Sequence, residues 1–395
     1  KEKNKIPLEE LNKFDYIFCG YGLSSCIILY KMSSDNFFRS KSILVIENSI
    51  KDENKTWCFW DKKDSIWDEF IAKKWSEIRF KNVDTHIDYN LNQLRYNMIN
   101  SPMFFKKIKN IVESKLKISL VHDNVLNVSE ENETVNVMSK NGQYTANKVF
   151  NSIPKFTPYD DSKSFPKLLQ HFKGWTIKTN KSCFNPHMAT IMDFSIDQKN
   201  ETRFFYLLPK KNNEALIEFT LFTKNLVEKE EYESEIKKYI SSLSIKDYVI
   251  ISKEKGVIPM TCFPYDKYNL SNLIHIGTAG GWTKPSSGYT FRFIDKFSDK
   301  LISFIISERS FKNFKFRNRY WFYDLIFLDV LFNKNSVGSF LFETMFKKNS
   351  FNSIFRFLDN EGSYWDDLRI INSFPKLMFI KSFLKNIPKA ISAYL

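Results

Sequence analysis

Apolar positions near the start of the chain fall in two short runs separated by a glycine turn. FDYIFC (14–19) is followed by Gly20-Tyr21-Gly22 and an apolar segment of helical length, and KSILVIEN (41–48) is the second run. Apolar runs of about four to eight residues are typical of buried strands. The order of strand, glycine turn, helix and strand predicts the beginning of a parallel sheet with a helical connection.

The pattern changes twice farther along the chain. Ser101-Pro102 begins a segment of helical periodicity, since proline is favoured at the first helical position. Between about 170 and 255, strand-like runs such as TRFFYLLP and EALIEFTLF alternate with loops that contain Asn, Lys and Pro. These runs predict an antiparallel sheet that a helix at about 228–243 interrupts. Beyond 311 the pattern is helical and rich in Phe, Lys and Leu.

The glycine turn after the first strand carries a nucleotide-binding pattern. It is G-x-G-x-x-S, with Gly20 and Gly22 followed by Ser24 and Ser25 at the start of the helix. The glycines permit a tight turn and the close approach of a pyrophosphate, which then sits on the helix N-terminus. We predict that these four residues contact a dinucleotide and that Glu47, the acid ending the second run, binds ribose hydroxyls. The alternative is an incidental glycine turn in a parallel sheet.

A second glycine-rich segment, IHIGTAGGWTKPSSGYTFRF (274–293), again follows a strand-like run and leads into a helix. The first segment alone does not separate FAD from NAD. Many flavoproteins bring a return segment of this kind to the ribityl chain and ring system of FAD, so we predict that its backbone amides face a flavin. The residues expected to contact the flavin or to shape this loop are Gly277, Thr278, Gly280, Pro285 and Gly288.

One carboxylate interrupts an apolar run in the middle of the chain. Glu218 lies in ALIEFTLFTK (215–224), where an ionised side chain is unfavourable without a partner. A carboxyl group in an apolar pocket has its pKa raised, so it can stay protonated near neutral pH. On a strand, Glu218 shares a face with Leu216, Thr220 and Phe222. The alternative is a solvent-facing residue on a half-exposed strand.

Composition narrows the possible classes of protein. The 395 residues suggest two or three subdomains, and the 39 phenylalanines suggest that apolar side chains line a cavity as well as a core. A net charge of +14 fits nucleic acid, an anionic membrane surface or an acidic ligand. The basic residues are dispersed and no nucleic-acid-binding motif accompanies them, so we expect no nucleic-acid partner.

Neither cysteines nor histidines show the spacing of a metal site. There are five of each, and we expect reduced thiols and no metal ligand set. The polar first residues, KEKNKIPLEELNK, predict that no signal peptide precedes the fold. No stretch approaches the roughly 18 apolar residues that a membrane span needs.

Several blocks of the sequence, in the same order, resemble the bacterial FAD-dependent lycopene cyclases. Linked blocks are more specific than any single motif. They are DYIFCGYGLSS (15–25), NKTWCFWD (54–61), FKGWTI (172–177), MDFSIDQKNETRFFYLLP (192–209), IEFT (217–220), GVIPM (256–260), GTAGGWTKPSSGY (277–289) and FYDLIFL (322–328).

The resemblance implies a flavin-monooxygenase-like fold, which agrees with the pattern of predicted elements. We expect an α/β chain (α+β overall) with a Rossmann-like, doubly wound FAD domain, an antiparallel-sheet substrate domain and a helical C-terminal part. The FAD domain is assigned to 1–80, 95–165 and 255–310. The substrate domain is assigned to 81–94 and 166–254, and the helical region to 311–395.

The resemblance also implies an activity. It is cyclisation of the linear ends of lycopene, or of a related linear carotenoid, to β-ionone rings without net redox change. Family members need reduced FAD, and NAD(P)H or another reductant supplies its electrons. On this resemblance Glu218 is the catalytic acid and Trp57, Phe219 and Phe222 contact substrate, although Trp57 suits the core equally well.

This sequence departs from the related proteins at three places. Ser25 replaces the third fingerprint glycine, and Thr278 follows Gly277 where related redox flavoproteins usually carry aspartate. Phe219 stands where family members often have a second carboxylate beside the one corresponding to Glu218. Glu218 must therefore work alone or share its proton with the flavin.

The C-terminal segment PKLMFIKSFLKNIPKAI (375–391) predicts a basic amphipathic helix. Such a helix can lie in an anionic membrane interface, so we expect a cytoplasmic protein associated peripherally with the inner face of the cell membrane. The alternative is a terminal helix packed on its own core. The lysines of one side are Lys376, Lys381, Lys385 and Lys389, and the apolar residues of the other are Leu377, Ile380, Phe383, Leu384 and Ile387.

Two other functions fit the same sequence features. One is a redox flavoenzyme of the same fold, either a monooxygenase or an isoprenoid reductase, which would depend on O2 or consume the reduced flavin. The other is a carotenoid- or lipid-binding protein without activity, in which replacement of Glu218 would leave the pigment unchanged.

Overall fold

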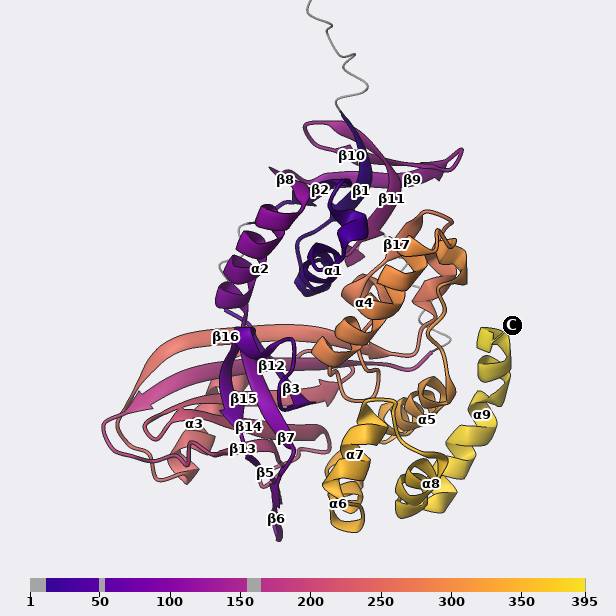
Figure 1. The fold of residues 1–395 in the computed structure, drawn as a ribbon. Helices are drawn as coiled ribbons and strands as arrows, with labels where there is room; N and C mark the ends of the chain where they lie inside the picture. Colours follow the sequence, from indigo (N-terminus) through magenta and orange to yellow (C-terminus); the bar gives the residue numbers. More distant parts are fainter. Residues whose placement is uncertain (1–11, 50–53, 155–164, 395) are drawn as a thin grey trace, which may run out of the picture.

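The structure, a computed structural model, describes residues 12–49, 54–154 and 165–394. Residues 1–11, which carry most of the polar stretch used to predict the absence of a signal peptide, lie outside these ranges. Figure 1 shows two large sheets, one above the other, with a group of C-terminal helices beside the lower one.

The upper sheet is built around parallel strands. They lie in the order β8 (Lys117–His122), β2 (Ser42–Glu47), β1 (Lys13–Cys19), β11 (Gln143–Asn151) and β17 (Leu273–His275). The antiparallel strands β10 (Thr134–Ser139) and β9 (Val125–Glu131) extend the sheet beyond β11. Helices α1 (Leu23–Ser33), α2 (Ser101–Lys115) and α4 (Phe291–Ile306) pack together beneath it (Figure 1).

Helix α1 is central to this part of the molecule. Nine of its eleven residues are buried, because the sheet covers one side and α2 and α4 cover others. A helix that is apolar nearly all round belongs in a core. This burial fixes the helix N-terminus against the carboxyl ends of β1 and β2, where ligands bind in sheets of this kind.

The lower sheet is antiparallel except between β13 and β5. Its order is β16 (Tyr248–Thr261), β12 (Lys167–Thr179), β15 (Glu214–Thr223), β14 (Thr202–Lys211), β13 (Met188–Asp193), β5 (Glu77–Asn82) and β6 (Thr85–Asn90). Helix α3 (Lys229–Ser242) packs on one face, over the cluster that contains Phe205 and Phe219. The opposite face packs on the C-terminal helices.

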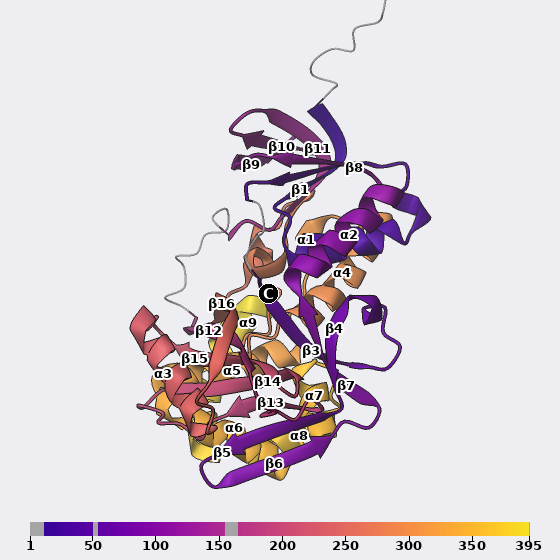
Figure 2. The same ribbon diagram turned by 90° about the vertical axis from the view of Figure 1, so that its left-hand side faces the viewer.

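A small third sheet connects the two large ones. It consists of β3 (Thr56–Lys62), β7 (Leu94–Asn100) and β4 (Ile71–Trp75), and Figure 2 shows it between the upper helices and the lower sheet. Sequence patterns did not separate this sheet from the FAD domain. Strand β5 begins four residues before the predicted boundary at 80/81, and β16 runs through the one at 254/255.

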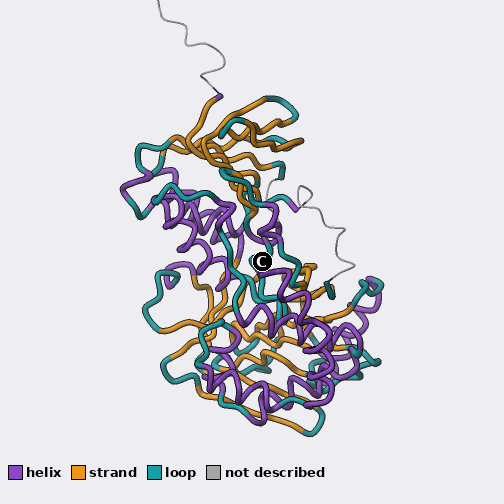
Figure 3. Tube along the Cα trace, turned by 90° about the vertical axis from the view of Figure 1, so that its right-hand side faces the viewer, coloured by secondary structure: helices purple, strands orange, loops and turns teal. Residues whose placement is uncertain are grey.

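The C-terminal region is helical, as the pattern predicts (Figure 3). Its longer helices are α5 (Arg319–Asn333), α6 (Gly338–Lys348), α7 (Phe351–Leu358), α8 (Tyr364–Ser373) and α9 (Lys376–Tyr394). Among the described residues, no single helix has the length and hydropathy of a membrane span; 319–333 and 335–348 pass that test only as a pair, bent by 112°.

Candidate active site

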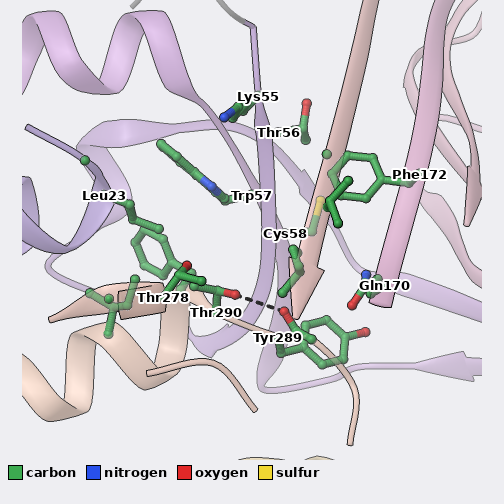
Figure 4. A pocket seen from close by; sticks show the side chains of 18 of the residues that line it. Leu23, Lys55, Thr56, Trp57, Cys58, Gln170, Phe172, Thr278, Tyr289 and Thr290 are labelled. Atoms are coloured by element: carbon green, nitrogen blue, oxygen red, sulfur yellow. Dashed lines mark hydrogen bonds between the residues drawn. The ribbon is translucent and has the colours of Figure 1, made fainter. Parts of the chain in front are cut away.

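A cavity of about 720 Å³ lies between the upper helices, the small sheet and the lower sheet. Figure 4 shows Leu23 and Thr278 on one side of it and Gln170 and Phe172 on the other. The predicted site residues that line the cavity are Gly22, Ser24, Trp57, Glu218, Gly277, Thr278 and Gly288. Segments almost 270 residues apart in sequence therefore meet here, as a site for a dinucleotide and a second ligand requires.

The first glycine turn has the geometry of an anion site. Gly20 has a φ of +94°, and a Cβ atom there would lie 2.3 Å from the hydroxyl of Ser152. Gly22 precedes α1, whose first turn contains no acidic residue. The free N–H groups of a helix N-terminus favour negative charge, so this turn fits a phosphate group.

Ser25 explains how the third fingerprint position tolerates a side chain. Its hydroxyl is fully buried and donates a 2.7 Å hydrogen bond to the carbonyl of Gly20. The serine thus closes the turn on itself instead of contacting the cavity. The departure from glycine keeps the turn compact.

Glu47 lies where the pattern predicts, at the end of β2 beside the glycine turn. One carboxylate oxygen accepts a 2.7 Å hydrogen bond from the backbone N–H of Tyr21, and the other accepts from the N–H of Asn48 at 3.0 Å and of Ser49 at 3.1 Å. Glu47 therefore fixes the turn and stands behind Ser49, which lines the cavity.

The second glycine segment closes against α1 and β12. Gly277 has a φ of +60°, and a Cβ there would lie 2.6 Å from the hydroxyl of Ser24. A Cβ at Gly288 would overlap the amide of Gln170, and one at Gly280 would lie 2.1 Å from the carbonyl of His275. Because Gly277 and Gly288 have no side chain, the backbone of the segment lies directly on the cavity wall. The segment therefore fits the predicted contact of backbone amides with a flavin. Gly280 and the half-buried Pro285 shape the loop from behind the cavity wall.

Glu218 reaches the cavity from the middle of β15. Its carboxyl accepts a 3.0 Å hydrogen bond from the hydroxyl of Thr220. In the neighbouring strand β12 the residue opposite Glu218 is Gly174, and Gly174 is also opposite Glu254 of β16. The two glutamates thus approach one another across a residue without a side chain.

The electrostatics of this pair are unusual. Burial raises the pKa of Glu218 well above that of an ordinary glutamate, and the charge of Glu254 raises it further. Burial also raises the pKa of Glu254, although Thr56 and Lys210 oppose this effect by favouring its ionised form. The pKa of Glu218 is therefore raised more strongly than that of Glu254.

Sequence reasoning missed Glu254. It stands between Lys253 and Lys255, a pattern that favours a solvated strand edge. The only hint was its position just before the GVIPM block that the related proteins share. Its inward placement depends on the pairing of β12 with β16, for which the sequence gives no local signal.

Two predicted substrate contacts do not reach the cavity wall. Phe219 points to the opposite face of the sheet, because side chains alternate along a strand, and its ring stacks on Phe205 at 5.0 Å. Phe222 shares the face of Glu218 but packs between Phe204 at 5.3 Å and Phe342 at 6.1 Å. Both rings stabilise the core beside the site.

Other aromatic side chains form the wall instead. Tyr96, Tyr206 and Tyr289 line the cavity together with Trp57 and Phe172. Burial raises the pKa of Tyr289 to about 12 and that of Tyr96 and Tyr206 well above the ordinary value, so these phenols stay neutral. Neutral aromatic faces attract cations, with about 0.5–2 kcal/mol from each favourable contact.

Comparison with known proteins gives a family and a fold. The model of the family described as lycopene cyclase protein matches residues 15–384, nearly the whole chain. No curated protein sequence matches. Among solved structures, the flavin-dependent brominase Bmp2 aligns with a TM-score of 0.60 at 11% identity, covering 90% of this chain and 97% of that one.

Two further structures have the same fold. The halogenase PltM in complex with phloroglucinol and FAD has a TM-score of 0.60 at 11% identity, covering 88% of this chain and 82% of its own. A geranylgeranyl bacteriochlorophyll reductase-like protein from Thermoplasma acidophilum has a TM-score of 0.55 at 11% identity, covering 96% and 98%. At such identities the likeness establishes an α/β flavoprotein fold, as the sequence predicts, and leaves the reaction open.

Proposed function

The chain belongs to the lycopene cyclase family, and on that premise we propose that it closes rings at the linear ends of lycopene or a related linear carotenoid. Glu218 is the proton donor. The observation that carries this proposal is a carboxyl group with a raised pKa on the wall of an aromatic cavity that also reaches both glycine segments.

The reaction needs a proton on a terminal carbon–carbon double bond. Protonation leaves a tertiary cation, a second double bond attacks it to close a six-membered ring, and a proton then leaves the ring. A carboxyl group can protonate an alkene only where water does not compete, and the cavity supplies apolar walls. Trp57, Tyr206 and Tyr289 present neutral rings that stabilise the cation without attacking it.

FAD is the cofactor that the cavity fits. The turn at Gly20 and Gly22 would hold the pyrophosphate, and Glu47, at the end of β2, would bind the ribose hydroxyls. The segment from Gly277 to Gly288 would face the ring system. A reduced flavin held there would supply an electron-rich ring next to the developing positive charge. NAD(P)H is the reductant we propose, and the reaction itself consumes no electrons.

A membrane surface is the proposed source of the substrate. Helix α9 packs on α5 through polar and aromatic contacts: the hydroxyl of Ser382 donates to the carbonyl of Ile326 at 3.1 Å, Lys385 pairs with Asp329 at 2.6 Å, and the rings of Phe383 and Phe322 lie 5.5 Å apart. Part of its apolar side nevertheless faces outward, with Leu377 85% exposed.

Exposed apolar and aromatic side chains also occur on α8, the preceding helix, and we propose that they form one surface with those of α9. Tryptophan and tyrosine beside aliphatic residues are typical of the interfacial region of a bilayer. The members of this α8–α9 surface are Tyr364, Trp365, Leu368, Leu377, Ile380, Phe383, Leu384 and Ile391. Neighbouring lysines at 376 and 381 would meet anionic headgroups.

Anaerobic incubation of the purified protein with lycopene in anionic liposomes and reduced FAD tests the activity. We expect cyclic product while the flavin stays reduced, and Glu218→Gln should abolish product. Glu214→Gln is the matched control, since Glu214 lies on the same strand but pairs with Lys211 at 3.9 Å. Product that requires O2, or that oxidises flavin in proportion, would contradict the proposal in favour of a redox flavoenzyme.

A further inference from the structure

Glu254 and Glu218 meet because of a glycine on the strand between them. Gly174 on β12 is in register with both residues. A Cβ at Gly174 would lie 3.1 Å from the Cγ of Glu254, 3.4 Å from the Cβ of Glu218 and 2.9 Å from Leu216. Any side chain there would enter the space between the two glutamate side chains. The backbone of three strands thus holds the two acids together.

The hydrogen bonds of Glu254 show where a proton must be. Its side chain is 6% exposed, and its Oε2 accepts a 2.6 Å hydrogen bond from the hydroxyl of Thr56. Its Oε1 is buried and meets no N–H or O–H donor among the described residues when Glu218 is ionised. Two buried carboxylates in contact repel, and a buried acceptor without a donor is unfavourable. A proton on Glu218, donated to Glu254, removes both difficulties.

The groups around the pair decide which member is ionised. Lys210 of β14 favours a charge on Glu254, and the hydroxyl of Thr56 also stabilises that charge. Cys58 of β3 and Tyr206 of β14 face the pair, and burial raises the pKa of each, so neither contributes a charge near neutral pH. On β15 itself, Thr220 donates to Glu218. The arrangement leaves the proton on Glu218 and the charge on Glu254.

We propose that Glu254 is the proton-sharing partner of Glu218 and that the pair both delivers the proton to the carotenoid and recovers the one that leaves. This inference rests on the proposed function. Glu254 does not line the cavity, so it is a positioning residue that acts through Glu218.

The proton balance of the cycle closes within the pair. The Glu218 carboxyl gives its proton to the terminal alkene carbon, and the alkene electron pair forms the new C–H bond. The pair then carries two negative charges opposite one carbocation. After ring closure, the C–H bond beside the cationic carbon breaks, its electrons form the ring double bond, and the proton returns to Glu218. Repulsion from Glu254 makes Glu218 a strong enough base for that return.

The pH dependence of turnover tests this role, because Glu218 must be protonated at the start of each cycle. Activity should fall as pH rises through the pKa of Glu218. Glu254→Gln keeps the size of the side chain but removes the charge that favours protonation, and its amide can donate to an ionised Glu218. The alkaline limb should therefore move to lower pH, so that activity at pH 8 relative to pH 6 falls at least about tenfold below the wild-type ratio. Glu254→Asp should restore most of the wild-type profile.

If Glu254→Gln has no measurable turnover, infrared spectra of the reduced holoenzyme can still measure the protonation of Glu218. The band of a protonated carboxyl that Glu218→Gln abolishes should titrate at lower pH in Glu254→Gln than in the wild type. FAD content and melting temperature report whether each variant folds. Lys253→Gln, on the same strand but beside the ring of Trp175, is the control and should match the wild type.

The outcomes separate the two proposals. If Glu218→Gln is inactive but Glu254→Gln keeps the wild-type pH profile and carboxyl titration, the shared proton is wrong and Glu218 acts alone. If Glu218→Gln retains activity, the proposed acid itself is wrong. A uniform loss of kcat in Glu254→Gln, with an unmoved pH profile and carboxyl band, would show that Glu254 is only structural.

Discussion

Two buried carboxylate sites in this protein are built in opposite ways. Asp324 on α5 pairs with Lys284 of the second glycine segment at 2.9 Å, and both side chains are at most 4% exposed. Lys284 also donates to the amide oxygen of Asn360 at 2.7 Å. Glu218, by contrast, is influenced by the charge of another acid, Glu254.

The difference separates a structural site from a reactive one. Burial raises the pKa of Asp324, but the charge of Lys284 opposes that effect, so the pair holds the second glycine segment on the C-terminal helices as a compensated ion pair. At Glu218 no cation among the described residues compensates burial, which agrees with its proposed role as the acid. Loss of a partner should therefore have opposite consequences at the two sites: lost stability at one and lost chemistry at the other.

The largest expected effect is on turnover. Glu218→Gln removes the proposed proton donor, and general acid catalysis typically contributes about 10²–10⁴-fold. We expect at least about 100-fold lower cyclisation, measured anaerobically in liposomes. The melting temperature should stay equal or rise, because an uncompensated buried acid is replaced by a neutral amide. A marked loss of stability would show that Glu218, like the Lys284–Asp324 pair, has a structural role.

The next effect is on folding. Lys284→Met keeps much of the side-chain volume but leaves Asp324 without its cation, and breaking a buried pair typically costs about 3–5 kcal/mol. Denaturant unfolding should report this loss. The double variant Lys284→Met/Asp324→Leu should recover part of it, since no charge then remains buried. Equal stability of the single variant and the wild type would show that the pair is dispensable.

The dependence of stability on alkaline pH should reveal the raised pKa of Glu218. The folded-state pKa of Glu218 is raised, so its contribution to stability is fully present below the ordinary glutamate pKa and is lost as pH rises through the folded-state value. Over that range the free energy of unfolding falls by up to about 1.4 kcal/mol per pH unit. Glu218→Gln should show a flatter dependence, and identical slopes would contradict a raised pKa.

The smallest effect should come from Thr220. Its hydroxyl donates to Glu218 at 3.0 Å and lowers the pKa of that carboxyl, in opposition to the larger effect of burial. Thr220→Val keeps the shape of the side chain and removes this donor. The alkaline limb of the pH–activity profile should move slightly to higher pH, opposite to the shift expected for Glu254→Gln. A shift to lower pH would mean that Thr220 stabilises the protonated carboxyl.

Local signals in the sequence were sufficient to predict both large sheets, the helical C-terminal region and several residues of the cavity. The glycine turns and the strand-like runs predict the parallel sheet, the antiparallel sheet and the position of Glu218, because periodicity and turn chemistry are local properties. The helical C-terminal region follows from the same patterns. Gly22, Ser24, Gly277, Thr278 and Gly288 all line one cavity.

What the sequence did not provide depends on pairing between distant strands. The contact of Glu218 with Glu254 exists only because β12 places Gly174 opposite both. The tyrosines at 96, 206 and 289 lie on three separate segments, each of which suits an ordinary core. Alternation along β15 turned Phe219 away from the cavity, although adjacency in sequence suggested a contact. The exposure of Leu377 and Leu384 follows from the way α9 packs on α5, which amphipathicity alone does not specify.

The most direct measurement is an infrared pH titration of the reduced holoenzyme, wild type against Glu218→Gln. The account predicts a protonated-carboxyl band at neutral pH that is present in the wild type, absent in Glu218→Gln and retained in Glu214→Gln. A wild-type-minus-variant difference that contains only ionised carboxylate bands at neutral pH would contradict it, since Glu218 could then not be the acid.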